Sequence, residues 1–207
     1  KRAGDISQGD KTGDKPLSNV VKEYVKEKYN KPGEVFLGVV HRLDRPTSGI
    51  IIFARTSKAL ERLNKMLREK TIRKTYWAVV KNQPKKASDT LIHYLKKNPR
   101  NNKSTAYNKE IDGSKKAVLH YKTIKKLDHY SLLEIDLETG RHHQIRCQLS
   151  TAGSPIKGDL KYGFNRSNKD GSIHLHARKI NFTHPVSKEK ISITAPLSED
   201  PIWDSCT

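Results

Sequence analysis

The sequence predicts an α+β fold, with a single domain over residues 1–207 built around a largely antiparallel mixed sheet and flanked by helices and loops. Many short segments have strand composition, and two or three segments with helical spacing interrupt them. No internal repeat is present. The chain has 207 residues, of which 34% are hydrophobic, and this is enough for one packed core.

The first helix is predicted between residues 17 and 29. Asp14 is a possible N-cap, and Pro16 falls in the first helical turn. Pro32 and Gly33 end the pattern. The apolar side chains that recur at three- and four-residue spacing are Leu17, Val20, Val21, Tyr24 and Val25.

A second helix is predicted directly after Thr56 and Ser57, because both residue types favour the N-cap position. One face of this helix is apolar, as expected of an amphipathic surface helix. Its apolar members are Ala59, Leu60, Leu63, Met66 and Leu67.

Strands are predicted around these helices from composition and alternation. Residues 74–81 place Tyr76, Ala78 and Val80 on one face, with Trp77 and Val79 on the other. Further strands or extended segments are predicted at 35–40, 50–53, 133–137, 175–182 and 191–194.

Residues 98–116 are polar and basic, and this favours a long hairpin arm or a mobile loop over a core segment. Such an arm could close on a ligand.

The charge balance predicts a polyanionic partner. Lys and Arg number 41 against 22 Asp and Glu, which leaves a formal net charge of +19. Nucleic acid is favoured over a membrane, because no apolar run approaches the roughly 20 residues of a spanning helix. The sequence also lacks the CxxC pairs of a zinc knuckle or disulfide framework, so a reducing cytoplasm is the expected compartment.

The segment HRLDRPTSG, residues 41–49, places one carboxylate, Asp44, beside an apolar run. A carboxylate buried near a core strand costs several kcal/mol unless a cation compensates it. Arg42 and Arg45 are close in sequence, but neighbouring side chains diverge in an extended segment. A distant arginine is therefore a better partner, and the segment ETGRHHQIR supplies Arg141 and Arg146.

Several motifs in this order resemble one enzyme family. HRLDRPTSG is followed by IIIFAR, KTYWAVV, TGRHHQIR, LSTAGSPIKGD and LHARKINFTHP. Together, over residues 35 to 197, the chain resembles the RluA-type family of pseudouridine synthases, which act on ribosomal and transfer RNA. The resemblance implies a reaction without cofactor or metal, in which uracil leaves its ribose, turns and is rejoined through carbon 5.

The resemblance also implies roles for individual residues. Asp44 matches the catalytic aspartate and Tyr76 the active-site tyrosine. Arg146 matches the arginine that pairs with the aspartate, and Arg141 is the second choice for that pairing. Arg42 matches an arginine that enters the space left by a flipped nucleotide.

Other basic side chains are expected to bind RNA. Lys74 is expected to contact a phosphate or a carboxylate, and Arg45 and Arg141 are further RNA-binding candidates. Gly49 and Ser48 are expected to serve the turn, since glycine permits positive φ. His143 and Gln144 are expected to hold their own loop by hydrogen bonds.

A zinc site at His174 and His176 is disfavoured, because no further ligands follow at suitable spacing. Many relatives carry a small RNA-binding domain before the catalytic one, and the sequence has no separate domain of this kind unless it was cut away. Substrate choice is then expected to depend on loops such as 98–116 and 163–172.

Two other functions remain open from the residues alone. One is a catalytically inactive RNA-binding or ribosome-assembly protein of the same fold, and the other is a nucleotide glycosidase. A single carboxylate fits an isomerisation better than hydrolysis, which commonly uses two. No obligate protein partner is evident, and a monomer is expected.

Overall fold

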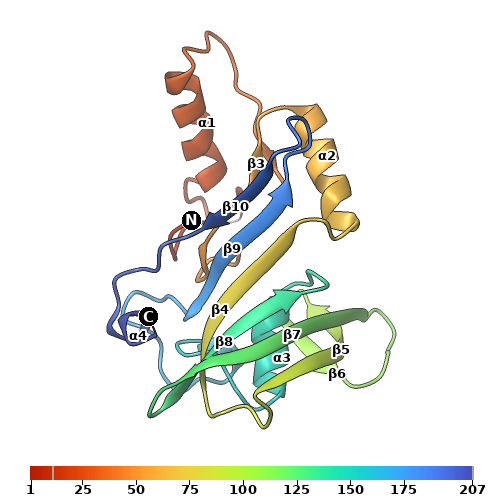
Figure 1. Ribbon diagram of the computed structural model, residues 1–207, viewed down its shortest axis with the longest axis vertical. Helices are drawn as coiled ribbons and strands as arrows, with labels where there is room; N and C mark the ends of the chain where they lie inside the picture. The colour runs from red at the N-terminus through yellow and green to blue at the C-terminus, as the bar shows by residue number, and fades with distance from the viewer. Residues whose placement is uncertain (11, 207) are drawn as a thin grey trace.

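The structure, a computed structural model, describes residues 1–10 and 12–206. Its main feature is an eight-stranded sheet (Figure 1) in which seven strands follow the order β10-β9-β4-β8-β7-β5-β6 with antiparallel neighbours, and β2 pairs in parallel with β9. This confirms the predicted α+β fold around a largely antiparallel mixed sheet. The strands are β2 Ser48–Gly49, β4 Arg73–Lys81, β5 Ser88–Asn98, β6 Lys103–Tyr107, β7 Lys115–Lys126, β8 Tyr130–Leu137, β9 Leu175–Thr183 and β10 Lys190–Thr194.

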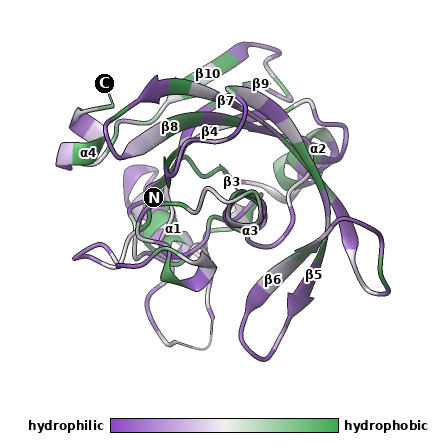
Figure 2. Ribbon diagram, turned by 90° about the horizontal axis from the view of Figure 1, so that it is seen from below, coloured by the Kyte–Doolittle hydropathy of each residue, from purple (hydrophilic) through white to green (hydrophobic). Residues whose placement is uncertain are grey.

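Helices and a small second sheet complete the fold. Figure 2 shows the large sheet curving around α3. The small sheet pairs β1 Gly38–Val39 with β3 Phe53–Ala54. Among the described residues, no helix has the length and apolar character needed to span a membrane. The helices are α1 Leu17–Lys28, α2 Ser57–Arg68, α3 Gln144–Thr151 and α4 Pro201–Asp204, with a 3-10 turn at Leu160–Tyr162.

Strand β4 divides its side chains between two apolar clusters, as its alternation predicts. Tyr76, Ala78 and Val80 belong to the cluster that contains Ile145 and Leu149 of α3. On the other face of β4, Trp77 and Val79 pack with Trp203 of the C-terminal helix. The sheet is therefore covered on both faces near its centre, and α3 packs on the face that holds Tyr76.

The predicted N-terminus of α2 is confirmed. The Thr56 side chain accepts a hydrogen bond from the Ala59 backbone nitrogen at 3.1 Å. The N-cap predicted for α1 is wrong: Pro16 occupies that position, just outside the helix, and no side chain caps it. The Asp14 carboxylate instead forms an ion pair with Arg45 Nη2 at 2.7 Å.

Residues 35–53 form less strand than expected. The expected strand at 35–40 is reduced to Gly38–Val39, and the apolar run at 50–52 lies outside the strands. The preceding Ser48 and Gly49 pair with β9 instead, and Ile50 continues the contact by donating to the Ala177 carbonyl at 3.0 Å. Ile50 and Ile52 of this run are half-buried and pack against a cluster that includes Leu63 of α2.

Two long strands, β5 and β7, were not predicted. Their apolar residues do not alternate: Leu91 and Ile92 are adjacent in β5, and Ala117, Val118 and Leu119 follow one another in β7. Between them, β6 pairs with β5 over Lys103–Tyr107, so the hairpin alternative for residues 98–116 is correct. The face of β7 that meets α3 holds Ala117 and Leu119, both fully buried.

Gly49 joins β2 to β9 at a distance that excludes a side chain. Its φ is +112°, and a Cβ there would overlap the Ala177 carbonyl oxygen and lie 2.5 Å from the Ala177 nitrogen. Both atoms belong to the backbone of a central strand, so they cannot move aside cheaply.

We expect Gly49→Ala to destabilise the protein by more than the roughly 1–3 kcal/mol of backbone strain alone, because the clash with β9 adds to it. The control is Gly171→Ala, at φ +71° with nothing within 4 Å of the new Cβ, where strain alone applies. Chemical denaturation measures both free energies of unfolding. Equal losses in the two variants would contradict the proposed role of close packing.

Candidate active site

The loop that carries Asp44 is fixed from two sides. The Leu43 side chain lies in the main core cluster with Tyr76 and Ile145. On the outer side, Ser7 Oγ donates to the Leu43 carbonyl and accepts from the Leu43 nitrogen, both at 3.2 Å. The Thr47 nitrogen closes the turn onto the Asp44 carbonyl at 3.0 Å. The carboxylate is therefore presented by a loop with little freedom.

Arg146 lies between two carboxylates. Its Nε and Nη2 donate to Oδ2 and Oδ1 of Asp159 at 2.6 Å and 2.8 Å, a bidentate pair. The remaining Nη1 donates to Asp44 Oδ2 at 3.1 Å. The predicted partner of Asp44 is thus confirmed as Arg146 and not Arg141. The other oxygen, Asp44 Oδ1, makes no hydrogen bond or ion pair with any residue that the structure describes.

The three charges differ in exposure. The side chains of Arg146 and Asp159 are 5% and 1% exposed, whereas that of Asp44 is 28% exposed. Burial by itself would lower the pKa of Arg146, but the hydrogen bonds and charge of Asp159, followed by those of Asp44, raise it. Arg146 therefore stays charged, and the group carries a formal charge of −1.

His143 lies against this group in a strained conformation. It caps α3 with φ 51° and ψ 29°, the left-handed region. Its Nε2 is 3.7 Å from Asp44 Oδ2, and its Nδ1 is hydrogen-bonded to Tyr162 Oη at 3.0 Å. Burial, followed by the charge of Arg146, lowers the pKa of His143 to about 2. The ring is therefore neutral at physiological pH.

Tyr76 approaches the same place from β4. Its side chain is buried, and burial followed by the negative charge of Asp44 raises the pKa of its phenol well above the ordinary range. The phenol consequently keeps its proton at physiological pH. Tyr76 belongs to the main core cluster and also lines the cleft beside Asp44.

These residues line a cleft of about 660 Å³. Asp44, Tyr76 and Arg146 all contribute to its wall, so the three predicted catalytic residues come together. The four predicted RNA-binding residues line the same cleft, as does Lys97. They are Arg42, Arg45, Lys74 and Arg141.

The four basic residues differ in their own contacts. Arg42 is exposed and has no partner among the described residues. Arg141 is also exposed, and its Nε donates to the Lys116 carbonyl at 2.9 Å. Lys74 is half-buried, and burial lowers its pKa. Arg45 forms the ion pair with Asp14 described above.

Other predicted residues hold the local backbone. Gln144 Oε1 accepts from the Arg141 nitrogen at 2.9 Å and from Thr139 Oγ1 at 2.8 Å, which confirms that it fixes the loop before α3. His174 Nε2 is hydrogen-bonded to Asp200 at 2.9 Å, and His176 Nδ1 to Ser48 Oγ at 2.8 Å. Both histidines thus bind protein groups.

Sequence reasoning missed Asp159 and Tyr162. Both follow Arg146 within the motif region GSPIKGDLKY. The Tyr162 ring centroid is 5.1 Å from the Arg146 guanidinium carbon, and its hydroxyl accepts from the Ser104 nitrogen at 2.8 Å. Asp159 is 13 residues from Arg146 in sequence, and only the fold brings the two side chains together.

Comparison with known proteins identifies the family. The profile of the RNA pseudouridylate synthases matches residues 1–151. The chain belongs to this family. As a pseudouridylate synthase homologue, it is 37% identical over 77% of its length to an uncharacterized RNA pseudouridine synthase of Synechocystis sp.. It is 35% identical over 82% of its length to ribosomal large subunit pseudouridine synthase C of Vibrio vulnificus.

The chain spans about half the length of these relatives, 50% and 54% respectively. Solved structures of this family share the fold. The human RNA pseudouridylate synthase domain containing 4 matches with a TM-score of 0.79 and 21% identity, covering 96% of this chain and 84% of that one. The human domain containing 1 matches with a TM-score of 0.69 and 21% identity, covering 98% of this chain and 86% of that one.

We expect Arg146→Ala to reduce the free energy of unfolding by about 3–5 kcal/mol, since two carboxylates then face each other without their common cation. The control is Arg141→Ala, an exposed arginine on the adjoining loop, for which a change within about 0.5 kcal/mol is expected. Urea denaturation measures both. If the two variants are equally stable, the ion pair contributes little.

The neutral state of His143 predicts acid sensitivity. In the unfolded chain histidine gains a proton near its ordinary pKa of about 6.5, whereas in the folded protein the pKa of His143 is about 2. The unfolded state thus binds the extra proton between these values, and stability falls as pH decreases, by up to about 1.4 kcal/mol per pH unit for this group.

His143→Gln should flatten the dependence of unfolding free energy on pH between pH 6 and 4 by about that amount. Some slope should remain, because the pKa values of His41 and His176 are also lowered, chiefly by burial, to about 3 and about 4. Denaturation curves recorded across this range provide the measurement. Parallel profiles for the variant and the wild type would contradict the assignment.

Proposed function

We propose that the protein isomerises uridine in RNA to pseudouridine, with Asp44 as the catalytic carboxylate. The observation that carries this proposal is the carboxylate of Asp44, held by a buried arginine at the wall of a basic cleft, with one oxygen still free. Family membership supports the reaction class. We further propose that it acts as a monomer in the cytoplasm.

Asp44 Oδ1 is the atom available to the substrate. Arg146 donates to Oδ2 and is itself held by Asp159, so the carboxylate is kept in a fixed orientation. A carboxylate so placed can form a covalent bond to the substrate or stabilise a sugar that has lost its base. In either case uracil stays in the cleft, turns, and is rejoined through carbon 5.

Tyr76 is proposed to contact the uracil. Its ring provides a stacking surface, and its hydroxyl provides a donor and an acceptor. Because the raised pKa keeps the phenol protonated, we do not assign it the role of a phenolate base. Tyr76 can accept the proton lost from carbon 5 only if it donates its own proton in the same step.

The substrate is proposed to be an unpaired or flipped uridine, since the glycosidic bond is hidden in a stacked helix. Arg42, exposed at the cleft and two residues before Asp44, is proposed to fill the vacated space. Arg141 and Lys74 are proposed to bind phosphates. Relatives in Vibrio and Neisseria are named for the large ribosomal subunit, so ribosomal RNA is the first substrate to test and transfer RNA the second.

We expect Asp44→Asn to lower turnover by at least about 100-fold, because the amide can neither attack nor carry the negative charge. The assay is tritium release from ribosomal RNA labelled at carbon 5 of uracil. The control is Asp136→Asn, an exposed aspartate on β8 that accepts from Thr75 Oγ1 at 2.9 Å, which should retain turnover.

Three outcomes contradict the proposal. Wild-type turnover in Asp44→Asn would exclude the assigned carboxylate. RNA binding by the wild-type protein without any modified uridine would favour the inactive RNA-binding alternative. Release of free uracil would identify a glycosidase.

A further inference from the structure

A second cavity lies at the far end of α3 from the cleft, and it has no role in the proposed reaction. Its volume is about 530 Å³. Asn82 Nδ2, at its edge, donates to the Gly153 carbonyl just beyond α3 at 3.0 Å. The lining comes from the end of β4, the β7–β8 turn and the loop after the 3-10 turn: Lys81, Asn82, Gln83, Leu127, Asp128, His129, Tyr130, Phe164 and Asn165.

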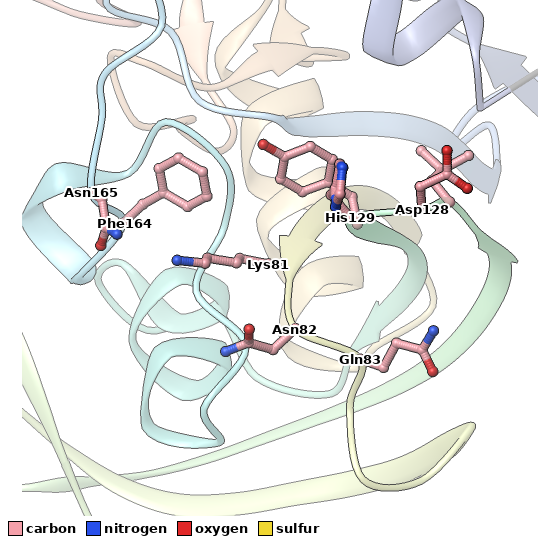
Figure 3. A pocket seen from close by; sticks show the side chains of 9 residues that line it. Lys81, Asn82, Gln83, Asp128, His129, Phe164 and Asn165 are labelled. Carbon is pink, nitrogen blue, oxygen red and sulfur yellow. The ribbon is translucent and has the colours of Figure 1, made fainter.

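The side chains around this cavity combine aromatic and polar groups. Figure 3 shows Lys81 reaching into the space between Phe164 and His129, with its amino group on the side of Phe164 and Asn165. Phe164 and Tyr130 are half-buried, so part of each ring remains accessible.

Five of the polar side chains that line the cavity have no partner in the described protein. Within the described part of the chain, the following side chains form no hydrogen bond or ion pair: Lys81, Gln83, Asp128, His129 and Asn165. A cation, amides and a carboxylate next to aromatic rings match the components of a nucleotide: phosphate, base edges and base faces.

We propose that this cavity binds an unpaired nucleotide of the RNA substrate, separate from the uridine at Asp44. The base packs on Phe164, Lys81 binds a phosphate, and the amides and Asp128 bind polar base edges or a ribose hydroxyl. The occupant rests on the proposed function, which supplies RNA as the ligand, and on the net charge of +19, which disfavours a cationic peptide.

The position of the cavity determines how many nucleotides must lie between the two bound ones. Along β4, Tyr76 lines the cleft and Lys81 lines the second cavity, so the two sites are about 17 Å apart at about 3.4 Å per residue. At about 3.4 Å per stacked nucleotide this distance requires at least about five nucleotides. Phe164 and Asn165 belong to the loop at 163–172. The proposal therefore gives this loop the part in substrate choice that is expected from the sequence.

The test measures binding of a fluorescein-labelled oligouridylate of about 20 nucleotides. Phe164→Ala should weaken binding about 5- to 100-fold, the range for loss of one base–aromatic stack. Phe164→Leu preserves apolar packing and should lose affinity in the same direction, which guards against an unfolded variant. Phe36→Leu, an aromatic residue 46% exposed outside the cavity, should bind as the wild type does.

Charge and location are tested separately. Lys81→Gln should reduce the slope of log affinity against log salt by about 0.7, whereas Lys190→Gln on edge strand β10 should not. Ultraviolet cross-linking of the same oligouridylate should label the peptides that contain Phe164 or His129. With ribosomal RNA, Phe164→Leu should raise KM and leave kcat unchanged.

Two failures are distinguishable. If the wild-type protein isomerises uridine but both Phe164 variants bind like it and the cavity peptides are not labelled, the second site is refuted and the proposed function survives. If the wild-type protein neither binds nor modifies RNA, both proposals are refuted.

Discussion

The site depends on one shared guanidinium. Arg146 uses two nitrogens on Asp159 and one on Asp44, so its orientation is set by a carboxylate that is almost fully buried before it meets the one that faces the cleft. A lone arginine at Asp44 would lose side-chain entropy on pairing and could swing into solvent. Because Asp159 already orders the arginine inside the core, pairing with Asp44 costs little further side-chain entropy. Asp44 keeps one oxygen without a partner among the described residues.

The same arrangement explains why the site remains anionic inside a strongly basic protein. The surplus of +19 is spread over the surface, whereas Asp44, Arg146 and Asp159 together carry −1. The nearby His143 stays neutral because burial and Arg146 both oppose its protonation. We therefore propose that long-range attraction of a polyanion is separate from local chemistry at a carboxylate, with phosphates at Arg42, Lys74 and Arg141 and a nucleoside at Asp44.

Sequence reasoning succeeded where a local pattern and burial agree. The alternation in β4 places Tyr76 toward α3, and Thr56 caps α2, because each depends on neighbours along the chain. It failed where a partner distant in sequence determines the role of a residue. Asp14 pairs with Arg45 and does not cap α1, and the apolar residues of β5 and β7 do not alternate between the two faces. Asp159 could be assigned only once the fold placed it against Arg146, since nothing in GSPIKGD marks its aspartate as buried.

Helix α3 links the two parts of the molecule that we propose to bind RNA. Its first turn carries Arg146 and begins at the strained His143, while the backbone just past its end accepts from Asn82 at the second cavity. Every residue of α3 from Gln144 to Leu149 is buried, so the helix cannot shift without opening the core. A rigid element of this kind fixes the separation of the two cavities. We infer that an RNA that fills both cavities must present its unpaired nucleotide at one distance from the target uridine. The helix then selects the spacing of the two nucleotides, and the cavities select the bases.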